Sequence, residues 1–183
     1  MKKILIAICL VASACFCASC IRYDTNIEAG GTAVAKMAGF WDVTLYICDV
    51  NGEIVDDEPW TETSLLTYNT SDNSTEQMWI EYIDDGWRDF KFKVDICYPD
   101  RTFLTKGGWR PYYAEVAEDD DEPGNAVIYG GKVLEGQGHN VHGNPCDSIA
   151  FILKFDDDPY PAAYGYDHYL VTGIRYGGYE SKE

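Results

Sequence analysis

The sequence predicts a single all-β domain, an antiparallel up-and-down β-barrel of about 8–9 strands. Three observations support this fold class. Apolar and polar residues alternate along many short stretches, turn-forming residues separate these stretches, and no stretch after residue 38 keeps a helical period. Alternation with one apolar face is typical of half-buried antiparallel strands, so we expect each strand to bury one face.

Residues 1–19, ahead of this domain, have the layout of a secretory signal peptide. Lys2 and Lys3 form a basic start, and residues 4–17 are apolar or small and carry no charge. A transmembrane helix needs about 20 apolar residues, so this run is too short to span a membrane. A basic start, a short apolar run and small residues at its end indicate a cleaved signal instead.

The end of this signal resembles the lipobox of bacterial lipoproteins, in which a cysteine is acylated and becomes the new N-terminus. The segment reads Cys17-Ala18-Ser19-Cys20, with Cys17 where that motif usually has an aliphatic residue. A second candidate cleavage site is Ala12-Ser13-Ala14-Cys15. The resemblance implies that Cys20 carries the lipid and that residues 20–38 form a lipidated tether. Two or more acyl chains hold a protein firmly at a bilayer, so we expect an outer membrane lipoprotein of the cell envelope, facing the periplasm or the cell surface.

The folded domain is expected at residues 39–180, after a short helix at Ala33–Ala38. Alternation is clearest in three segments, Trp41–Cys48, Phe90–Cys97 and Ile149–Phe155. Weaker strand segments are residues 62–69, 77–84, 101–105, 112–116, 126–135 and 166–176. Turn signals between them are Asn51-Gly52, Asp85-Gly86, Pro99-Asp100, Lys106-Gly107-Gly108, Pro123-Gly124 and Asn144-Pro145. No internal repeat and no long linker divides this region, so one domain is expected.

Two features at the ends of the domain favour a barrel over a sandwich. Gly39-Phe40-Trp41 opens the first strand, and Arg175 lies in the last strand. The first and last strands of an up-and-down barrel pair to close the sheet. We therefore expect the Arg175 guanidinium to lie across the Trp41 indole, a cation–π contact of about 0.5–2 kcal/mol.

This Gly-x-Trp motif with a late arginine resembles the calycin superfamily, which includes the lipocalins. Further stretches are similar to the lipid-binding putative hydrolase family, small calycin-like lipoproteins of Gram-negative gut anaerobes. These stretches are Leu66-Thr67-Tyr68-Asn69-Thr70, Met78-Trp79-Ile80, Asp147-Ser148-Ile149-Ala150-Phe151, Phe155-Asp156-Asp157-Asp158-Pro159 and Gly173-Ile174-Arg175-Tyr176-Gly177-Gly178-Tyr179-Glu180. The family tends to end in Gly-x-Arg-x-Thr-Gly-Phe, so Gly177 and Tyr179 depart from it. The resemblance implies a lipid-like ligand and carries over no catalytic residues.

Charge and cysteine content exclude several classes of partner. The chain has 183 residues and a net charge of −17, which is unsuited to a phosphate backbone, so no nucleic acid partner is expected. Beyond Cys20, the domain has Cys48, Cys97 and Cys146. An odd number allows at most one disulfide among the three, and their spacing matches no zinc motif.

The sequence shows no catalytic motif, although it contains residue types that hydrolases use. The candidates are Ser148, Asp147, His139, His142 and His168. Ser148 lies outside any Gly-x-Ser-x-Gly elbow, and the two neighbouring histidines lie in a glycine-rich loop without an HExxH helix. The clustered aspartates of the chain lack the spacing of an EF-hand calcium loop. We expect no metal or cofactor, and binding in preference to catalysis.

An antiparallel barrel of about eight strands has an interior just wide enough for side chains or one small ligand. Aromatic residues make up 14% of the chain and suit a lipid or another small hydrophobic molecule. The residues expected to bind the ligand or close the barrel ends are Trp41, Arg175, Trp60, Trp79, Trp87 and Trp109. One alternative is an envelope protein-interaction module without a small-molecule site. A second alternative is a hydrolase.

Overall fold

The computed structural model describes residues 31–55, 58–83, 89–113 and 124–177. The chain divides into two units, Met1–Gly31 and Thr32–Glu183, and the fold described below is that of the second unit. The expected signal peptide, Cys20 and Trp87 lie outside the described residues.

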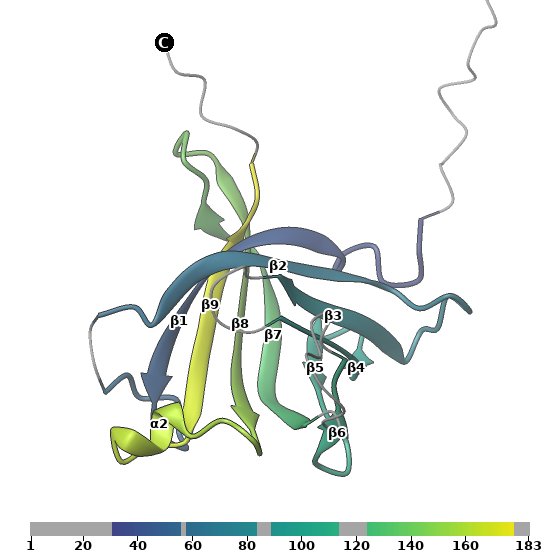
Figure 1. Ribbon diagram of the computed structural model, residues 1–183. Helices are drawn as coiled ribbons and strands as arrows, with labels where there is room; N and C mark the ends of the chain where they lie inside the picture. The colour runs from purple at the N-terminus through teal and green to yellow at the C-terminus, as the bar shows by residue number, and fades with distance from the viewer. Residues whose placement is uncertain (1–30, 56–57, 84–88, 114–123, 178–183) are drawn as a thin grey trace, which may run out of the picture. The chain divides into compact units, whose positions relative to one another are not determined.

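The described residues of this unit form nine strands and one short helix (Figure 1). The elements are β1 (Gly39–Cys48), β2 (Thr61–Asn69), β3 (Gln77–Ile83), β4 (Phe90–Cys97), β5 (Thr102–Leu104), β6 (Arg110–Pro111), β7 (Asn125–His139), β8 (Pro145–Phe155), α2 (Tyr160–Ala163) and β9 (His168–Arg175). The expected strand at 112–116 is reduced to an isolated bridge between Tyr113 and Lys91, and residues 114–116 lie outside the described part. The helix α2 has only four residues and begins after Pro159, so it shows no helical period in the sequence.

The strands form one antiparallel sheet that closes on itself. Its order is β5-β4-β3-β2-β1-β9-β8-β7-β6, and β5 also pairs with β7. These pairings close a barrel of 8 strands with β6 as one extra strand. The predicted fold class, an all-β up-and-down barrel, is therefore confirmed, including the pairing of the first strand with the last.

The alternating residues of each strand divide between the barrel interior and its outer face. In β1, Trp41, Val43 and Leu45 are at most 2% exposed, whereas Asp42 and Thr44 between them are only partly buried. β4 repeats the pattern with four buried apolar residues at alternate positions. Because successive side chains point to opposite faces of a strand, the apolar residues of every strand except β6 meet in one core.

The long strand β7 bends at two register shifts, between Tyr129 and Lys132 and between Leu134 and Gly138. The first shift lies where β7 meets β5, at the pair Phe103–Gly131. A Cβ atom on Gly131 would lie 2.6 Å from the Phe103 carbonyl oxygen, so no larger residue fits this approach. Bulges sharpen the bend of a strand, and this one lies at the pairing that closes the barrel.

The packed unit begins before Gly39, where the sequence analysis placed its start. Val34 and Met37 are fully buried and belong to the core. Residues 33–37 form hydrogen-bonded turns in place of the expected short helix, with Ala38 N–H donating to the Val34 carbonyl over 2.9 Å. The burial of two apolar side chains makes this segment part of the domain and not of a free tether. Within the described residues, no helix has the length and apolar character needed to cross a membrane.

Candidate functional site

One end of the barrel, the clasp end, is defined by Trp41, Arg175 and the turn 33–38. Trp41 and Arg175 are register partners on β1 and β9, and Arg175 Cζ lies 4.5 Å from the Trp41 ring centroid. The predicted cation–π contact is therefore present. It also explains the glycine of the Gly-x-Trp motif, because a Cβ atom on Gly39 would lie 2.5 Å from Arg175 Nη1.

Hydrogen bonds tie the clasp end together around these two side chains. Trp41 Nε1–H donates to Thr67 Oγ1 over 2.8 Å, and the Thr67 hydroxyl donates to the Met37 carbonyl over 2.6 Å. Arg175 Nη1–H donates to the Ala38 carbonyl over 2.6 Å, and Nη2–H donates to Asp147 Oδ2 over 3.2 Å. The bonds to the Met37 and Ala38 carbonyls hold the turn against the barrel. A ligand role for Trp41 and Arg175 stays a prediction.

The opposite end, the α2 end, is defined by α2, Trp60, Tyr164 and Tyr169. Trp60 is partly buried, and its ring centroid lies 5.6 Å from that of Tyr160 and 6.4 Å from those of Tyr164 and Tyr169. Tyr169 is fully buried, whereas Tyr160 and Tyr164 are 54% and 53% exposed. Ring contacts therefore run without a break from the core to solvent.

Trp79 and Trp109 lie elsewhere, on the outside of the barrel. Trp79 lies on the outer face of β3 between two lysines, with its ring centroid 5.4 Å from Lys91 Nζ and 5.1 Å from Lys93 Nζ. Trp109 is 46% exposed and lies 6.0 Å from Lys154 Nζ. The described tryptophans thus occupy four separate places, and only Trp60 joins an aromatic surface at a barrel end.

Aromatic rings fill much of the described barrel interior. The Tyr82 ring stacks on the Phe90 ring with 5.1 Å between their centroids. The ring centroids of Phe90 and Phe155 lie 5.3 Å apart, and those of Phe103 and Phe151 lie 5.5 Å apart. All five side chains are at most 4% exposed. An apolar ligand therefore needs side chains to move aside, or binds where the core reaches the surface.

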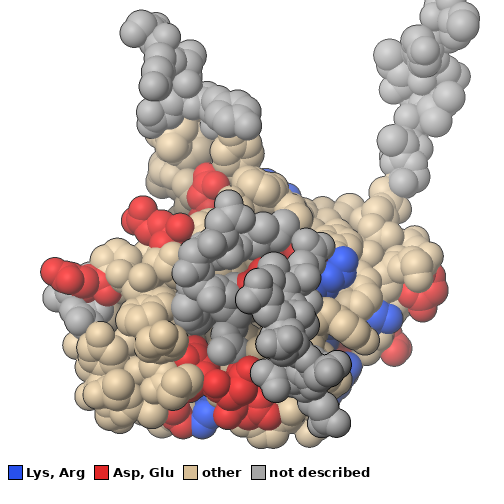
Figure 2. Space-filling view, viewed as in Figure 1, with Lys and Arg blue, Asp and Glu red and all other residues tan. Residues whose placement is uncertain are grey.

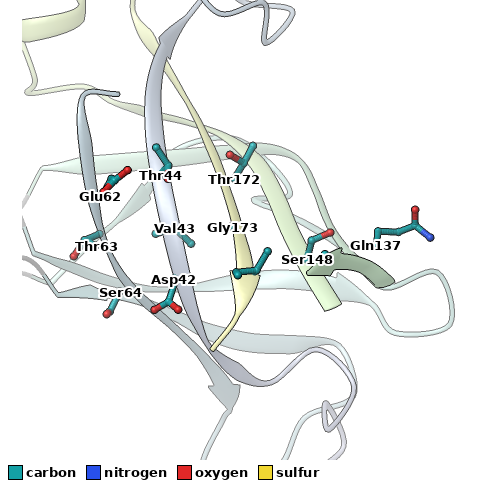
Figure 3. A pocket seen from close by; sticks show the side chains of 12 residues that line it. Asp42, Val43, Thr44, Glu62, Thr63, Ser64, Gln137, Ser148, Thr172 and Gly173 are labelled. Atoms are coloured by element: carbon teal, nitrogen blue, oxygen red, sulfur yellow. The ribbon is translucent and has the colours of Figure 1, made fainter. Parts of the chain in front are cut away.

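A hollow of about 700 Å³ lies on the outer face of the barrel (Figure 3). Its lining residues come from β1, β2, β7, β8 and β9 and are Asp42, Val43, Thr44, Glu62, Thr63, Ser64, Gln137, Gly138, Ser148, Thr172, Gly173 and Ile174. Most of the side chains that line it are polar. The hollow is therefore distinct in position from the apolar interior.

The structure does not assemble Ser148, Asp147 and a histidine into a catalytic triad. Asp147 reaches Arg175, while the neighbouring Ser148 lines the outer hollow, since successive residues of a strand face opposite sides. Within the part of the chain that the structure describes, no hydrogen bond joins Ser148 to a histidine. His139 and His142 are exposed near the β7–β8 turn.

His168 is buried beside charged groups at the α2 end of β9. Its Nδ1 atom lies 2.6 Å from Asp167 Oδ1, in an orientation that makes no hydrogen bond. A hydrogen bond from Lys154 is the main cause that lowers the pKa of the Asp167 carboxyl. His168 and Asp167 therefore form an ion pair only when the imidazole is protonated.

The three cysteines of the described domain are free. Cys48 is fully buried and pairs in register with His168, whereas Cys97 is exposed and Cys146 is partly buried. Burial, with smaller effects of Asp49 and Asp167, raises the pKa of Cys48 to about 12. A thiol with so high a pKa is a poor nucleophile at neutral pH.

The sequence did not indicate two groups of residues as site residues. The tyrosines of the α2 end follow Pro159 in a stretch without strand alternation, where only the spacing of Tyr160 and Tyr164 by one helical turn was a signal. The hollow left no signal, because Asp42 and Thr44 have the sequence pattern of any solvent-facing strand residues.

The closed barrel, in which the first strand pairs with the last, defines the class of calycin-like β-barrel proteins. Within this class, the chain belongs to the lipid-binding putative hydrolase family, whose family model matches residues 26–180. The resemblance found in the sequence is therefore confirmed. A comparison with curated proteins finds no match.

Proposed function

We propose that this protein binds a lipid or another small hydrophobic ligand at the α2 end of its barrel. The observation that carries the proposal is the unbroken series of ring contacts from buried Tyr169 through Trp60 to half-exposed Tyr160 and Tyr164. The family description supports a lipid as the kind of ligand. At the clasp end, by contrast, the polar groups around Trp41 already bond to one another.

The α2 end suits an acyl chain on physical grounds. Each methylene group moved from water into an apolar site contributes about 0.8 kcal/mol. The burial of about ten methylenes then offsets much of the 4–15 kcal/mol free-energy cost of association. Flat aromatic rings present apolar area with little side-chain entropy to lose, so Trp60 and its neighbouring tyrosines form a suitable contact surface.

The test compares two tryptophans in the full chain. Palmitate is titrated into the wild type, Trp60→Ala and Trp79→Ala, and the complexes are measured by native mass spectrometry. We expect one bound palmitate in the wild type and about tenfold weaker binding in Trp60→Ala, because a contacting ring is lost. Trp79→Ala is the matched control, since Trp79 lies on the outer face of β3.

Either of two results contradicts the proposal. One is equal weakening in both variants, and the other is the absence of a complex across a panel of fatty acids and phospholipids. Circular dichroism of both variants verifies that each remains folded.

We further propose that Cys20 anchors the protein to the outer membrane. The support is the signal-like segment 1–19 and its lipobox-like end. Cys20→Ser is expected to release the protein from the membrane fraction on cell fractionation, whereas Cys97→Ser is expected to leave it there. Retention of Cys20→Ser in the membrane fraction contradicts the anchor.

The packed interior favours one second candidate, an envelope protein-interaction module without a small-molecule site. This candidate predicts a stoichiometric crosslinked partner in cells. The crosslink would persist in the variant Tyr164→Trp, which places a larger side chain at the α2 end. Palmitate would not compete with the protein partner for binding. A crosslink that palmitate abolishes argues for the lipid site instead.

A further inference from the structure

The outer hollow presents an ordered grid of polar side chains (Figure 3). The strand register places Ser64, Asp42 and Ile174 in one row across β2, β1 and β9. The next row on the same face consists of Glu62, Thr44 and Thr172. Directly opposed side chains on one sheet face lie about 4.5–5.5 Å apart, so each carboxylate has hydroxyl groups as close neighbours.

These polar groups lack partners of their own. Among the described residues, neither Asp42 nor Glu62 forms a hydrogen bond or an ion pair, and the same holds for the side chains of Thr44, Ser64 and Thr172. No lysine, arginine or histidine is among the described lining residues. The hollow therefore contains two carboxylates, partly buried Asp42 and exposed Glu62, with no cationic side chain among the described lining residues.

No positively charged side chain among the described lining residues compensates the charge of Asp42. Asp42 is partly buried on β1, and burial raises the pKa of its carboxyl group. The whole chain carries a net charge of −17, and acidic side chains occupy several parts of the face shown in Figure 2. A cation is attracted by such a field, whereas an anion is repelled.

We propose that the outer hollow binds a small organic cation in which a primary ammonium group stands next to hydroxyl groups, as in an amino sugar. An ammonium group has three donors and no acceptor, which matches two carboxylates flanked by hydroxyl oxygens. The volume of about 700 Å³ is within the range of small-molecule sites. Ligand hydroxyls pair with Thr44, Thr172 and Ser64. This site lies on the outer face and does not depend on the lipid site at the α2 end.

Isothermal titration calorimetry with glucosamine and glucose tests this proposal on the full chain. The two sugars share a ring and differ in the ammonium group. We expect glucosamine to bind at least about tenfold more tightly than glucose, because a hydrogen bond between charged groups is the stronger contact. Equal binding of the two sugars would overturn the assignment of an ammonium ligand.

Matched variants locate the binding in the hollow. Asp42→Asn keeps the shape of the side chain and removes its charge, and we expect at least about tenfold weaker glucosamine binding. Glu53→Gln removes one charge from an exposed position outside the hollow and is expected to bind glucosamine like the wild type. Equal weakening in both variants would indicate attraction by net charge alone and would overturn the site.

A hydroxyl variant and a stability measurement complete the test. Thr172→Val is nearly isosteric and is expected to weaken glucosamine binding by a few-fold, through one lost neutral hydrogen bond. Thermal unfolding of Asp42→Asn is expected at or above the wild-type midpoint, because an uncompensated charge is removed. If this variant unfolds early, Glu62→Gln replaces it, with the same expected loss of binding. Unchanged binding in a folded carboxylate variant would overturn the proposal.

Discussion

The two ends of the barrel are closed by different kinds of contact. At the clasp end, buried and partly buried hydrogen bonds and one cation–π contact connect Trp41, Arg175 and Thr67 to the backbone of the turn 33–38. At the α2 end, aromatic rings pack around Trp60, and two of the neighbouring tyrosines remain half-exposed. Directional hydrogen bonds hold one geometry, whereas apolar contacts between rings tolerate rearrangement.

This difference assigns separate tasks to the two ends. The clasp end fixes the pairing of β1 with β9, on which barrel closure depends. The α2 end offers an apolar surface that a ligand can share or displace at small cost. Substitutions at the clasp end should therefore lower stability most, and those at the α2 end should affect binding most.

The largest effect is expected for Trp41→Ala. Removal of a fully buried tryptophan costs about 3–5 kcal/mol of unfolding free energy, because apolar contacts are lost and a cavity remains. Trp60→Ala, at the partly exposed α2 end, should cost clearly less. Urea denaturation of both variants measures the difference, and equal losses would remove the distinction between the two ends.

A smaller effect is expected for Gly39→Ala, which forces the Arg175 guanidinium off the Trp41 ring. We expect a loss of about 1–2 kcal/mol, the scale of one cation–π contact and its accompanying hydrogen bond. In an Arg175→Met background, the same glycine substitution should cost much less, because the displaced group is absent. A double-mutant cycle by urea denaturation measures this coupling, and strictly additive losses would contradict the clasp geometry.

The smallest effect is expected from an experiment that needs no substitution. Native thiols serve as probes of whether the α2 end opens. Cys48 is buried in the α2-end half of β1, and a pKa of about 12 leaves it little thiolate at pH 8. Iodoacetamide at that pH should therefore label exposed Cys97 first, with Cys48 labelled only after denaturation. Intact-mass analysis over time follows the order. Labelling of Cys48 as fast as Cys97 would mean that the α2 end is open.

Much of the fold was predictable because its signals are local. The alternation in β1, β4 and β8 by itself assigns each residue to the inner or the outer face of the barrel. Gly39, Trp41 and Arg175 were also predictable as a group, because barrel closure requires the first and last strands to meet. The contact between them follows from that single topological condition.

The candidate sites were less predictable. Trp60, Trp79 and Trp109 look alike in the sequence, yet only Trp60 lies at a barrel end among aromatic neighbours. An alternating pattern shows that Asp42 faces outward, but not that Glu62 and Thr172 flank it to line a hollow. Cross-strand neighbours depend on register, which is set between segments far apart in the chain.

The sequence by itself determined the strand content of this protein, the inward face of most strands and the residues that close its first and last strands. Those properties depend on alternation within a strand and on one pairing rule. Only the tertiary structure decided how β7 bends to meet β5, which aromatic rings reach the surface at the α2 end, and that the outer face is hollowed. These features depend on contacts between distant segments, whose free energy is not encoded in any one stretch of sequence.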